Sequence, residues 1–213
     1  MRWVVGLCGA SGSRYGLAVL RALVHAKQEV ALVVSRGGAR VLEIEEGIRV
    51  DPEAPDPALL VPGGGKRIRG YSLSDVAAPF SSGTHPVAGM VIVPCSMGTL
   101  ARVAHGISSN LLERAADVML KERRRLVLVP RETPLSLVHL RNMVAVTEAG
   151  AVVLPASPGF YHSPKSVDDL VAHVVTKVLD QLGVESRLIR RWGGGAAARA
   201  DPDPPPHPRR SPP

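Results

Sequence analysis

The stretch RWVVGLCGASGSRYG, residues 2–16, decides the fold. It joins an apolar run, RWVVGL, to a turn made of glycine and serine, after which an amphipathic segment begins. Four more apolar runs follow along the chain: EVALVV (29–34), GMVIVP (89–94), LVLVP (126–130) and AVVLP (151–155). These runs are rich in β-branched residues, do not alternate and are bounded by Gly, Ser or Pro. They are typical of parallel strands that are covered on both faces.

Amphipathic segments between these runs predict helices. They lie near residues 13–26, 36–46, 96–104, 110–122, 136–149 and 166–182. Alternating strands and helices predict an α/β fold with a doubly wound parallel sheet in a three-layer, Rossmann-type arrangement. Five strands favour the flavodoxin-like order 2-1-3-4-5, in which ligands bind at the carboxyl ends of the strands.

The chain of 213 residues is long enough for one domain with a full hydrophobic core. We expect residues 1–192 to form this single domain. Residues 51–88 are rich in Pro, Gly and Ser and are predicted to form a long loop excursion. Residues 193–213 are of low complexity and are expected to be disordered.

Composition narrows the range of partners. The net charge of +7 favours an anionic ligand, whereas aromatic residues at only 3% disfavour a single-strand nucleic-acid binder. Nucleic acid is therefore not an expected partner. Cys8 and Cys95 have no metal-binding spacing, so we expect no metal site and a reducing, cytoplasmic location. No uncharged apolar run reaches the roughly 18 residues of a membrane span, so no membrane partner is expected.

Three early strand ends carry glycine or hydroxyl residues at the expected ligand edge. The residues concerned are Gly9, Ser11, Gly12, Ser35, Ser96 and Thr99. Backbone amides and hydroxyls before a helix suit a bound anion. By itself, the first loop is explained as well by a plain tight turn as by a phosphate site, and each of the other two is better explained by helix capping alone. The coincidence of three such loops favours a bound cofactor.

The segment 111–125 gathers positive charge on a predicted helix. Arg114 and Lys121 are seven residues apart and share one face, about 10 Å apart along the axis. Asn110 is predicted to cap this helix, with Glu113 as its capping-box partner. Glu113, Asp117 and Lys121 also form an i, i+4 ladder, so the helix alone favours a solvated face.

Charged and aromatic residues follow the last two strands. Arg131 and Glu132 come directly after a buried strand, where functional residues gather, and Glu132 could act as a general acid or base. Tyr161 can pack against a flat ligand while its hydroxyl reaches a phosphate. His162 is interpreted as a loop or capping residue rather than a catalyst. Lys177, on the last helix, is by default an exposed cation.

Five segments together resemble the flavin prenyltransferase family: GASGSRYG (9–16), PCSMGTL (94–100), SSNLLERAADVMLKERR (108–124), LVLVPRETP (126–134) and PASPGFYHSP (155–164). The resemblance implies a flavodoxin-like fold. It also implies an enzyme that joins a dimethylallyl group from dimethylallyl phosphate to N5 and C6 of reduced FMN without a metal. The product, prenylated FMN, would serve a partner decarboxylase, and the sites would lie between subunits of a homododecamer.

The resemblance also implies roles for individual residues. The expected FMN contacts are Gly9, Ala10, Ser11, Ser35, Ser96, Thr99 and Arg131. The expected prenyl-phosphate site consists of Arg114, Lys121, Tyr161 and Lys177, with Trp192 nearby. Glu45 and Glu132 match the family's active-site carboxylates and, with Tyr161, are expected to be catalytic. One departure is Val76, which stands where the family often has an aromatic residue.

Two alternatives stay open at this point. The chain could be an FMN-binding carrier or assembly subunit without transferase activity, because the same loops would hold the flavin. It could also be a flavin-dependent decarboxylase of the cysteine type, which shares the fold. The second alternative is disfavoured because ASPGFY follows Pro155, where that family has a PxMNxxMW motif.

Overall fold

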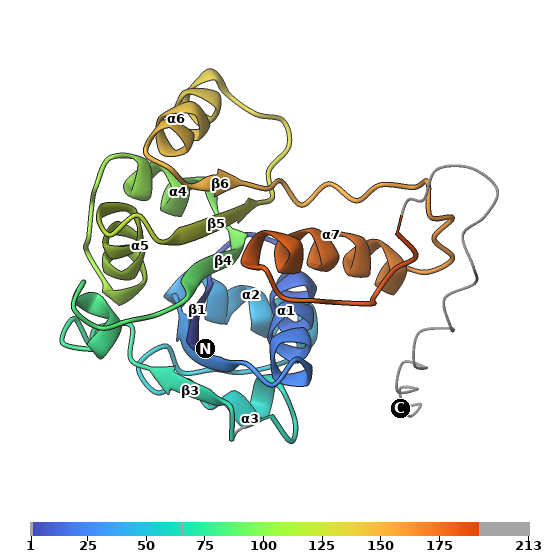
Figure 1. Ribbon diagram of the computed structural model, residues 1–213, viewed down its shortest axis with the longest axis horizontal. Coiled ribbons are helices and arrows are strands. Elements are labelled where there is room, and N and C mark those ends of the chain that lie inside the picture. Colours follow the sequence, from blue (N-terminus) through green and yellow to red (C-terminus); the bar gives the residue numbers. More distant parts are fainter. Residues whose placement is uncertain (1, 65, 192–213) are drawn as a thin grey trace.

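A sheet of six parallel strands forms the centre of the protein (Figure 1). The computed structural model describes residues 2–64 and 66–191. The strand order across the sheet is β3-β2-β1-β4-β5-β6. The strands are β1 (Arg2–Leu7), β2 (Glu29–Val34), β3 (Ile68–Tyr71), β4 (Gly89–Cys95), β5 (Arg125–Pro130) and β6 (Val152–Val153). The five predicted strands are confirmed in the predicted order.

The outermost strand, β3, was not predicted. It lies within 51–88, for which the sequence predicted a loop throughout. That prediction was wrong for β3, for the short helix α3 (Pro57–Leu60) and for the 3-10 helix η1 (Pro79–Ser81). β3 has four residues and pairs with β2 alone. Only its first and last residues are buried, so it lacks the apolar run that marks the other strands.

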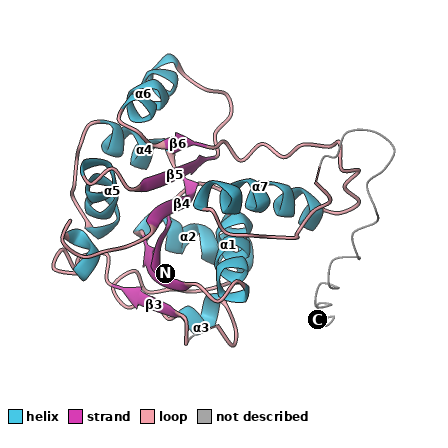
Figure 2. Ribbon diagram, viewed as in Figure 1, coloured by secondary structure: helices cyan, strands magenta, loops and turns pink. Residues whose placement is uncertain are grey.

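Helices cover both faces of the sheet (Figure 2). Buried residues of α1 and α7 pack against one face, and those of α4 and α5 pack against the other. The helices are α1 (Ser13–His25), α2 (Arg36–Glu46), α4 (Met97–Ala104), α5 (Leu111–Lys121), α6 (Leu137–Glu148) and α7 (Val167–Leu182). Within the described ranges, every helix is too short or too polar to cross a membrane.

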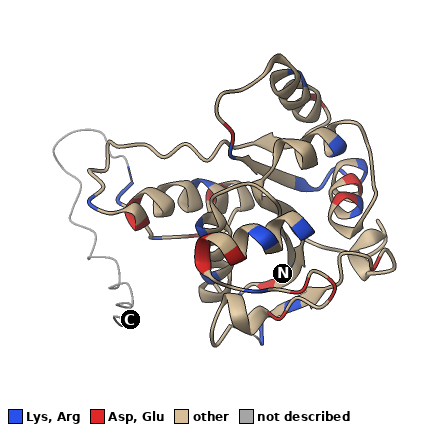
Figure 3. Cartoon of the chain, turned by 180° about the vertical axis from the view of Figure 1, so that it is seen from behind, with Lys and Arg blue, Asp and Glu red and all other residues tan. Residues whose placement is uncertain are grey.

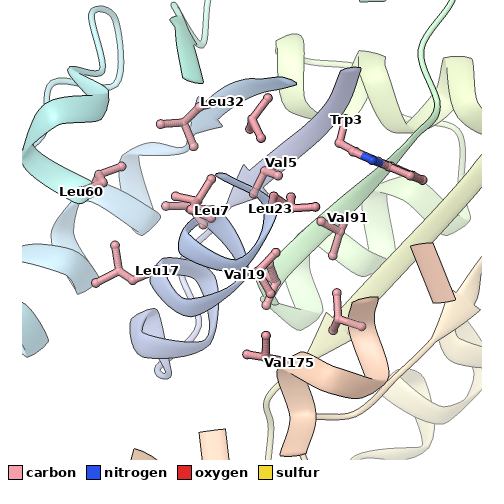
Figure 4. Close-up of a cluster of buried hydrophobic side chains, with 14 of the residues drawn as sticks. Trp3, Val5, Leu7, Leu17, Val19, Leu23, Leu32, Leu60, Val91 and Val175 are labelled. Carbon is pink, nitrogen blue, oxygen red and sulfur yellow. The ribbon is translucent and has the colours of Figure 1, made fainter. Parts of the chain in front are cut away.

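The alternation of side chains along β1 separates the two cores. Trp3, Val5 and Leu7 belong to the core beneath α1 and α7 (Figure 4), whereas Val4 and Cys8 belong to the core beneath α4 and α5. Both sets are buried, because successive strand residues point to opposite faces of a sheet that is covered on both sides. This explains why the apolar runs in the sequence do not alternate.

The carboxyl end of β1 is packed tightly against the first turn of α2. A Cβ atom built on Gly38 would lie 2.5 Å from the carbonyl oxygen of Leu7 and 3.2 Å from the Cα atom of Cys8. Both neighbours are backbone atoms, so neither can rotate away. A glycine at this position therefore lets two strand–helix junctions meet at the edge where ligands bind this class of fold.

We expect Gly38→Ala to destabilise the protein by about 1–3 kcal/mol, the usual cost of overpacking. Urea unfolding at pH 7 would measure this change. Gly98→Ala is the matched control, because a Cβ there meets only the tip of Arg102 at 3.8 Å. Since Gly98 lies within α4, alanine should leave stability unchanged or raise it by up to about 1 kcal/mol. Equal stability of Gly38→Ala and the wild type would contradict the close packing.

Candidate active site

The loop after β1 ends in a helix start that lacks a side-chain cap of its own. Gly12 is the N-cap of α1, with φ 108° and ψ 35°, and no side chain of α1 caps the first turn. Glu45 from α2 supplies the missing acceptor. Its carboxylate accepts hydrogen bonds from the Gly12 N–H at 3.0 Å, the Ser13 N–H at 2.8 Å and the Ser13 hydroxyl at 2.7 Å. The backbone amides that the sequence offered to a phosphate are therefore occupied by a side chain of the same protein.

These bonds determine the charge of Glu45. Partial burial alone would raise the pKa of its carboxyl group, but hydrogen bonds from Ser11, Ser13 and Gly12 together outweigh it and lower the pKa below its usual value. The carboxylate therefore stays ionised at neutral pH. Glu45 provides a fixed negative charge and a bridge between α1 and α2 at this edge of the sheet.

Two hydroxyl residues predicted to contact FMN cap helices. Ser35 Oγ accepts from the Gly38 N–H at 3.0 Å at the start of α2. Ser96 Oγ accepts from the Thr99 N–H at 3.3 Å and donates to the Thr99 hydroxyl at 3.1 Å. The capping alternative is thus confirmed for both serines. It does not exclude a ligand. Ser35 accepts from a helix N–H and still has its hydroxyl proton to donate, and Thr99, which accepts the Ser96 proton, still has its own.

Cys8 links the ends of β1 and β4. Its sulfur accepts from the Ser96 N–H at 3.0 Å and donates to the Pro94 carbonyl oxygen at 3.2 Å. A hydrogen bond with Cys95 is the largest influence on Cys8 and, with contributions from Thr99 and Ser96, it outweighs burial and lowers the pKa to about 6. The same bond raises the pKa of Cys95. Both thiols are free and buried.

Arg131 reaches from the end of β5 to the loop after β1. Its Nε donates to the Ser11 carbonyl oxygen at 3.2 Å, across 120 residues of sequence. The structure thus brings Ser11, Glu45 and Arg131 to one place. Glu132, the next residue, is exposed, and its carboxylate accepts from the Thr133 N–H at 3.2 Å. Arg131 and Glu132 at the carboxyl end of β5 and Glu45 from the last turn of α2 therefore bring one cation and two carboxylates to this edge.

The donors at this edge fit FMN. Gly9 and Gly37 approach so closely that a Cβ on Gly9 would lie 3.1 Å from the Cα atom of Gly37, which leaves backbone rather than side chains facing a ligand. The hydroxyls of Ser35, Ser96 and Thr99 and the guanidinium of Arg131 lie at the same edge of the sheet, a set of groups that suits a phosphate and a polar ribityl chain. The edge also lies at the switch point where β2 and β4 flank β1, the usual ligand crevice of such sheets.

The cations of α5 lie elsewhere. Arg114 donates to the Ser81 carbonyl oxygen at 3.1 Å and to the Asp117 carboxylate at 2.6 Å. Lys121 pairs with Glu122. Arg124 donates to the carbonyl oxygens of Gly83 and His85. Figure 3 shows acidic and basic residues side by side on this helix. Arg114 and Lys121 therefore border the segment 81–85.

The i, i+4 ladder predicted on α5 was wrong. Glu113 is only 4% exposed and pairs with Arg102 at 3.6 Å, so it does not face solvent. Asn110 caps the helix as predicted, accepting from the Glu113 N–H at 3.0 Å. The reciprocal bond of a capping box is replaced, because the Glu113 carboxylate accepts from the Ser109 N–H at 2.9 Å. Tertiary contacts with α4 decide these pairings.

Tyr161 and Lys177 belong to the opposite side of the protein. The segment 156–166 extends away from the sheet before α7 begins, and α5 lies on the other side (Figure 1). Tyr161 and Lys177 are both exposed. His162 Nε2 lies 3.3 Å from the Asp169 carbonyl oxygen, as suits a loop residue. Trp192 and residues 193–213, for which the sequence predicted disorder, lie outside the described residues. Val76 is exposed and lies in the segment after β3.

Within one chain, the predicted site is therefore divided. Ser11, Glu45 and Arg131 meet at the carboxyl edge. Arg114 and Lys121 lie together on α5, and Tyr161 and Lys177 lie on the other side of the protein. The sequence missed Ser13 and His173, which contact Glu45 and Tyr161 respectively. Ser13 could have been found as the first helical residue after the glycine turn; His173 carried no signal. In the described part of the chain, no three His, Cys, Asp or Glu residues lie together as a metal site would require.

The fold and this edge define a flavin-binding class of protein, and the chain belongs to the Flavoprotein family, whose model matches residues 1–179. Within that class, its relatives are flavin prenyltransferases. The enzyme of Halalkalibacterium halodurans is 47% identical over 191 residues, covering 90% of this chain and 93% of the relative. That of Pseudomonas aeruginosa is 46% identical over 196 residues, covering 90% and 94%.

Solved structures agree with this relationship. The crystal structure of AnUbiX (PadA1) in complex with FMN and dimethylallyl pyrophosphate superposes with a TM-score of 0.82 at 42% identity, covering 92% of this chain and 98% of that one. A dodecameric FMN-dependent UbiX-like decarboxylase from Escherichia coli O157:H7 superposes with a TM-score of 0.81 at 42% identity, covering 91% and 100%. The cysteine decarboxylase TvaF, at 16% identity and a TM-score of 0.56, shares the fold alone.

We expect Glu45→Gln to lower the stability of the protein at pH 7 by about 1 kcal/mol or less, because the site is partly exposed and one cap is weakened rather than lost. The folded-state pKa of Glu45 is lowered, so its contribution is present above the unfolded pKa and is lost as the pH falls through the folded value. The difference between wild type and variant should therefore shrink as unfolding is measured from pH 7 towards pH 3. Glu148→Gln, at an exposed end of α6, is the control. A difference independent of pH would contradict the role of charge.

Proposed function

We propose that this chain joins the dimethylallyl group of dimethylallyl phosphate to N5 and C6 of reduced FMN and so makes prenylated FMN. The observation that carries the proposal is the likeness to a protein, 42% identical over nearly its whole length, that was crystallised with FMN and dimethylallyl pyrophosphate. Reduced FMN supplies the nucleophilic atoms when it is bound. The chain belongs among transferases, and FMN is a substrate rather than a permanent group.

The proposed FMN contacts follow the carboxyl edge of the sheet. Arg131 would contact FMN and, because its Nε donates to the Ser11 carbonyl oxygen, would also fix the loop after β1 against the flavin. Ser35 and Thr99 would donate hydroxyl protons to the phosphate and ribityl oxygens, and Ser96, whose proton goes to Thr99, would contact FMN through its oxygen. The loop at Gly9 and Ala10 would approach through its backbone. Glu45, ionised and fixed, would hold this loop in shape and set a negative charge near the reacting atoms.

The proposed prenyl-phosphate contacts are cationic. Departure of the phosphate leaves negative charge that a site without a metal must stabilise with side chains. Arg114, Lys121 and Lys177 carry that positive charge, and the Tyr161 hydroxyl can donate to a phosphate oxygen. Glu132 would take or return the proton at N5 or C6, and the released phosphate, whose second pKa is near 6, could share this role.

These contacts require more than one subunit. Arg114 with Lys121 and Tyr161 with Lys177 lie on opposite sides of a single chain, so a second copy would have to bring them together. α6 offers a surface for assembly, since Leu137, Val138, Leu140 and Val144 on it are 45–64% exposed. A dodecameric structural relative supports a homododecamer. We propose that the cations of α5 and the segment 156–166 of a neighbouring chain form one site.

The product would serve a partner decarboxylase that uses prenylated FMN, and we place the enzyme in the cytoplasm, where thiols stay reduced. The two free, buried cysteines of the described chain agree with that location. The single domain is proposed to include residues 1–192, of which the family match covers 1–179. The alternative of an FMN carrier without activity makes a different prediction, which the first experiment tests.

Anaerobic incubation of the protein with reduced FMN and dimethylallyl phosphate should yield a flavin whose mass has increased by one five-carbon unit, measured by mass spectrometry. Glu132→Gln should still bind FMN but slow product formation by about 10²–10⁴-fold, the usual contribution of a positioned acid or base. Glu148→Gln is the matched control and should react as the wild type. Unmodified flavin from the wild type after long incubation would favour the carrier alternative.

Mixing two inactive variants tests whether the site forms between subunits. Arg114→Ala and Tyr161→Phe chains, co-assembled by dissociation and reassociation, should recover part of the wild-type rate, because some interfaces then combine an intact Arg114 with an intact Tyr161. Arg114→Ala mixed with Lys121→Ala should recover nothing, since both changes lie on the same side of the interface. Equal recovery in both mixtures, or none in the first, would contradict a shared site.

A further inference from the structure

A buried histidine on α7 contacts the tyrosine of the proposed prenyl-phosphate site. His173 is 7% exposed and lies in the second turn of α7. Its ring stacks on His162, with centroids 5.3 Å apart and planes at 11°. It meets the Tyr161 ring edge-on, at 5.6 Å and 80°. The rings of His173 on α7 and of Tyr161 and His162 in the preceding loop thus pack together, and Tyr161 is the exposed member at the edge of this cluster.

The hydrogen bonds of His173 fix where its proton lies. The Gly159 N–H donates to Nδ1 at 3.2 Å, so Nδ1 must be the acceptor nitrogen. A neutral imidazole has one acceptor and one donor nitrogen, so the proton is on Nε2. Nε2 lies 2.9 Å from the Tyr161 hydroxyl oxygen and therefore donates to it. The Tyr161 oxygen is thus an acceptor towards His173, and its own proton is donated in another direction.

Two further observations support this arrangement. Burial, the charge of His162 and the charge of Lys177, in that order, lower the pKa of His173, so the ring is neutral at pH 7 as the tautomer requires. The contact also depends on a glycine. A Cβ on Gly159 would lie 2.9 Å from the Tyr161 ring and 3.1 Å from His173 Nε2. The chain is therefore shaped to place these three residues against each other.

We propose that His173 is a positioning residue that sets the Tyr161 hydroxyl as a hydrogen-bond donor towards a phosphate oxygen of the prenyl donor. The inference rests on the proposed function, in which Tyr161 contacts that phosphate. A hydroxyl that accepts one hydrogen bond is polarised and donates a second one more strongly. Lys177 lies one turn further along the same helix and is exposed, so a phosphate near Tyr161 would also meet a cation from α7.

The test measures binding of dimethylallyl monophosphate by calorimetry to the full-length protein loaded with oxidised FMN, which does not react. His173→Phe keeps the ring but removes both hydrogen bonds and should weaken binding about 3- to 10-fold, the range of one hydrogen bond. His173→Gln, whose side-chain amide nitrogen can take the place of Nε2, should stay within about 2-fold of wild type. FMN affinity should be unchanged in both variants.

A double-mutant comparison separates positioning from general packing. In a Tyr161→Phe background there is no hydroxyl to orient, so adding His173→Phe should weaken binding by less than about 2-fold. In turnover assays, His173→Phe should lower kcat/KM for the prenyl donor, while KM for reduced FMN stays near the wild-type value. Should His173→Phe fail to fold, His173→Asn provides the same test, because its short side chain still accepts from Gly159 but does not reach Tyr161.

The inference is overturned if His173→Phe or His173→Asn binds the prenyl phosphate as tightly as the wild type. It is also overturned if the loss is the same with and without the Tyr161 hydroxyl, which would indicate a packing effect. Failure of the wild-type protein to bind dimethylallyl monophosphate would instead remove the proposed function, and this inference with it. The first two results leave wild-type binding and turnover intact, so the failures can be told apart.

Discussion

The carboxylate of Glu45 is the interaction on which the rest of the ligand edge depends. Gly12 lets the chain turn from β1 into α1, but it leaves the first amides of that helix without a side-chain acceptor. Glu45, from the last turn of α2, accepts from these amides and from the Ser13 hydroxyl. The loop after β1 is thereby joined to the last turn of α2, and Arg131 adds the segment after β5 by donating to the Ser11 carbonyl oxygen. Three segments distant in sequence thus form one rigid rim.

That rim accounts for half of the proposed reaction site. It offers a guanidinium, hydroxyls and a fixed carboxylate, which suit a flavin, but it holds none of the cations expected to bind the prenyl phosphate. Those cations lie on α5 and α7, on opposite sides of the chain. The two cations on α5 already form ion pairs: Arg114 with Asp117, and Lys121 with Glu122. Such exposed pairs are weak, so a phosphate that brings two negative charges could replace the carboxylates at small cost.

Most of the fold follows from the sequence, because its strands are uniformly apolar and its helices are periodic. The edge strand β3 does not, since it has only two buried residues and depends on β2 for its conformation. Capping by Ser35, Ser96 and Asn110 was visible in the sequence, whereas the partners of Glu113 and Arg114 were not. Those partners come from α4 and from the segment around Ser81, which approach α5 only in the folded chain. His173 was invisible for the same reason: its role comes from a loop 12 residues away in sequence that folds back onto α7.

The ends of the sheet have a consequence for how copies of this chain can associate. β3 has four residues with Arg69 exposed on it, and β6 has two. Strands this short, one of them bearing a charge, are poor templates for intermolecular backbone pairing. Self-association through added strands, the route to fibrous aggregates, is therefore discouraged at both borders. Contacts between copies are directed to helical surfaces, where side-chain shape can select one geometry.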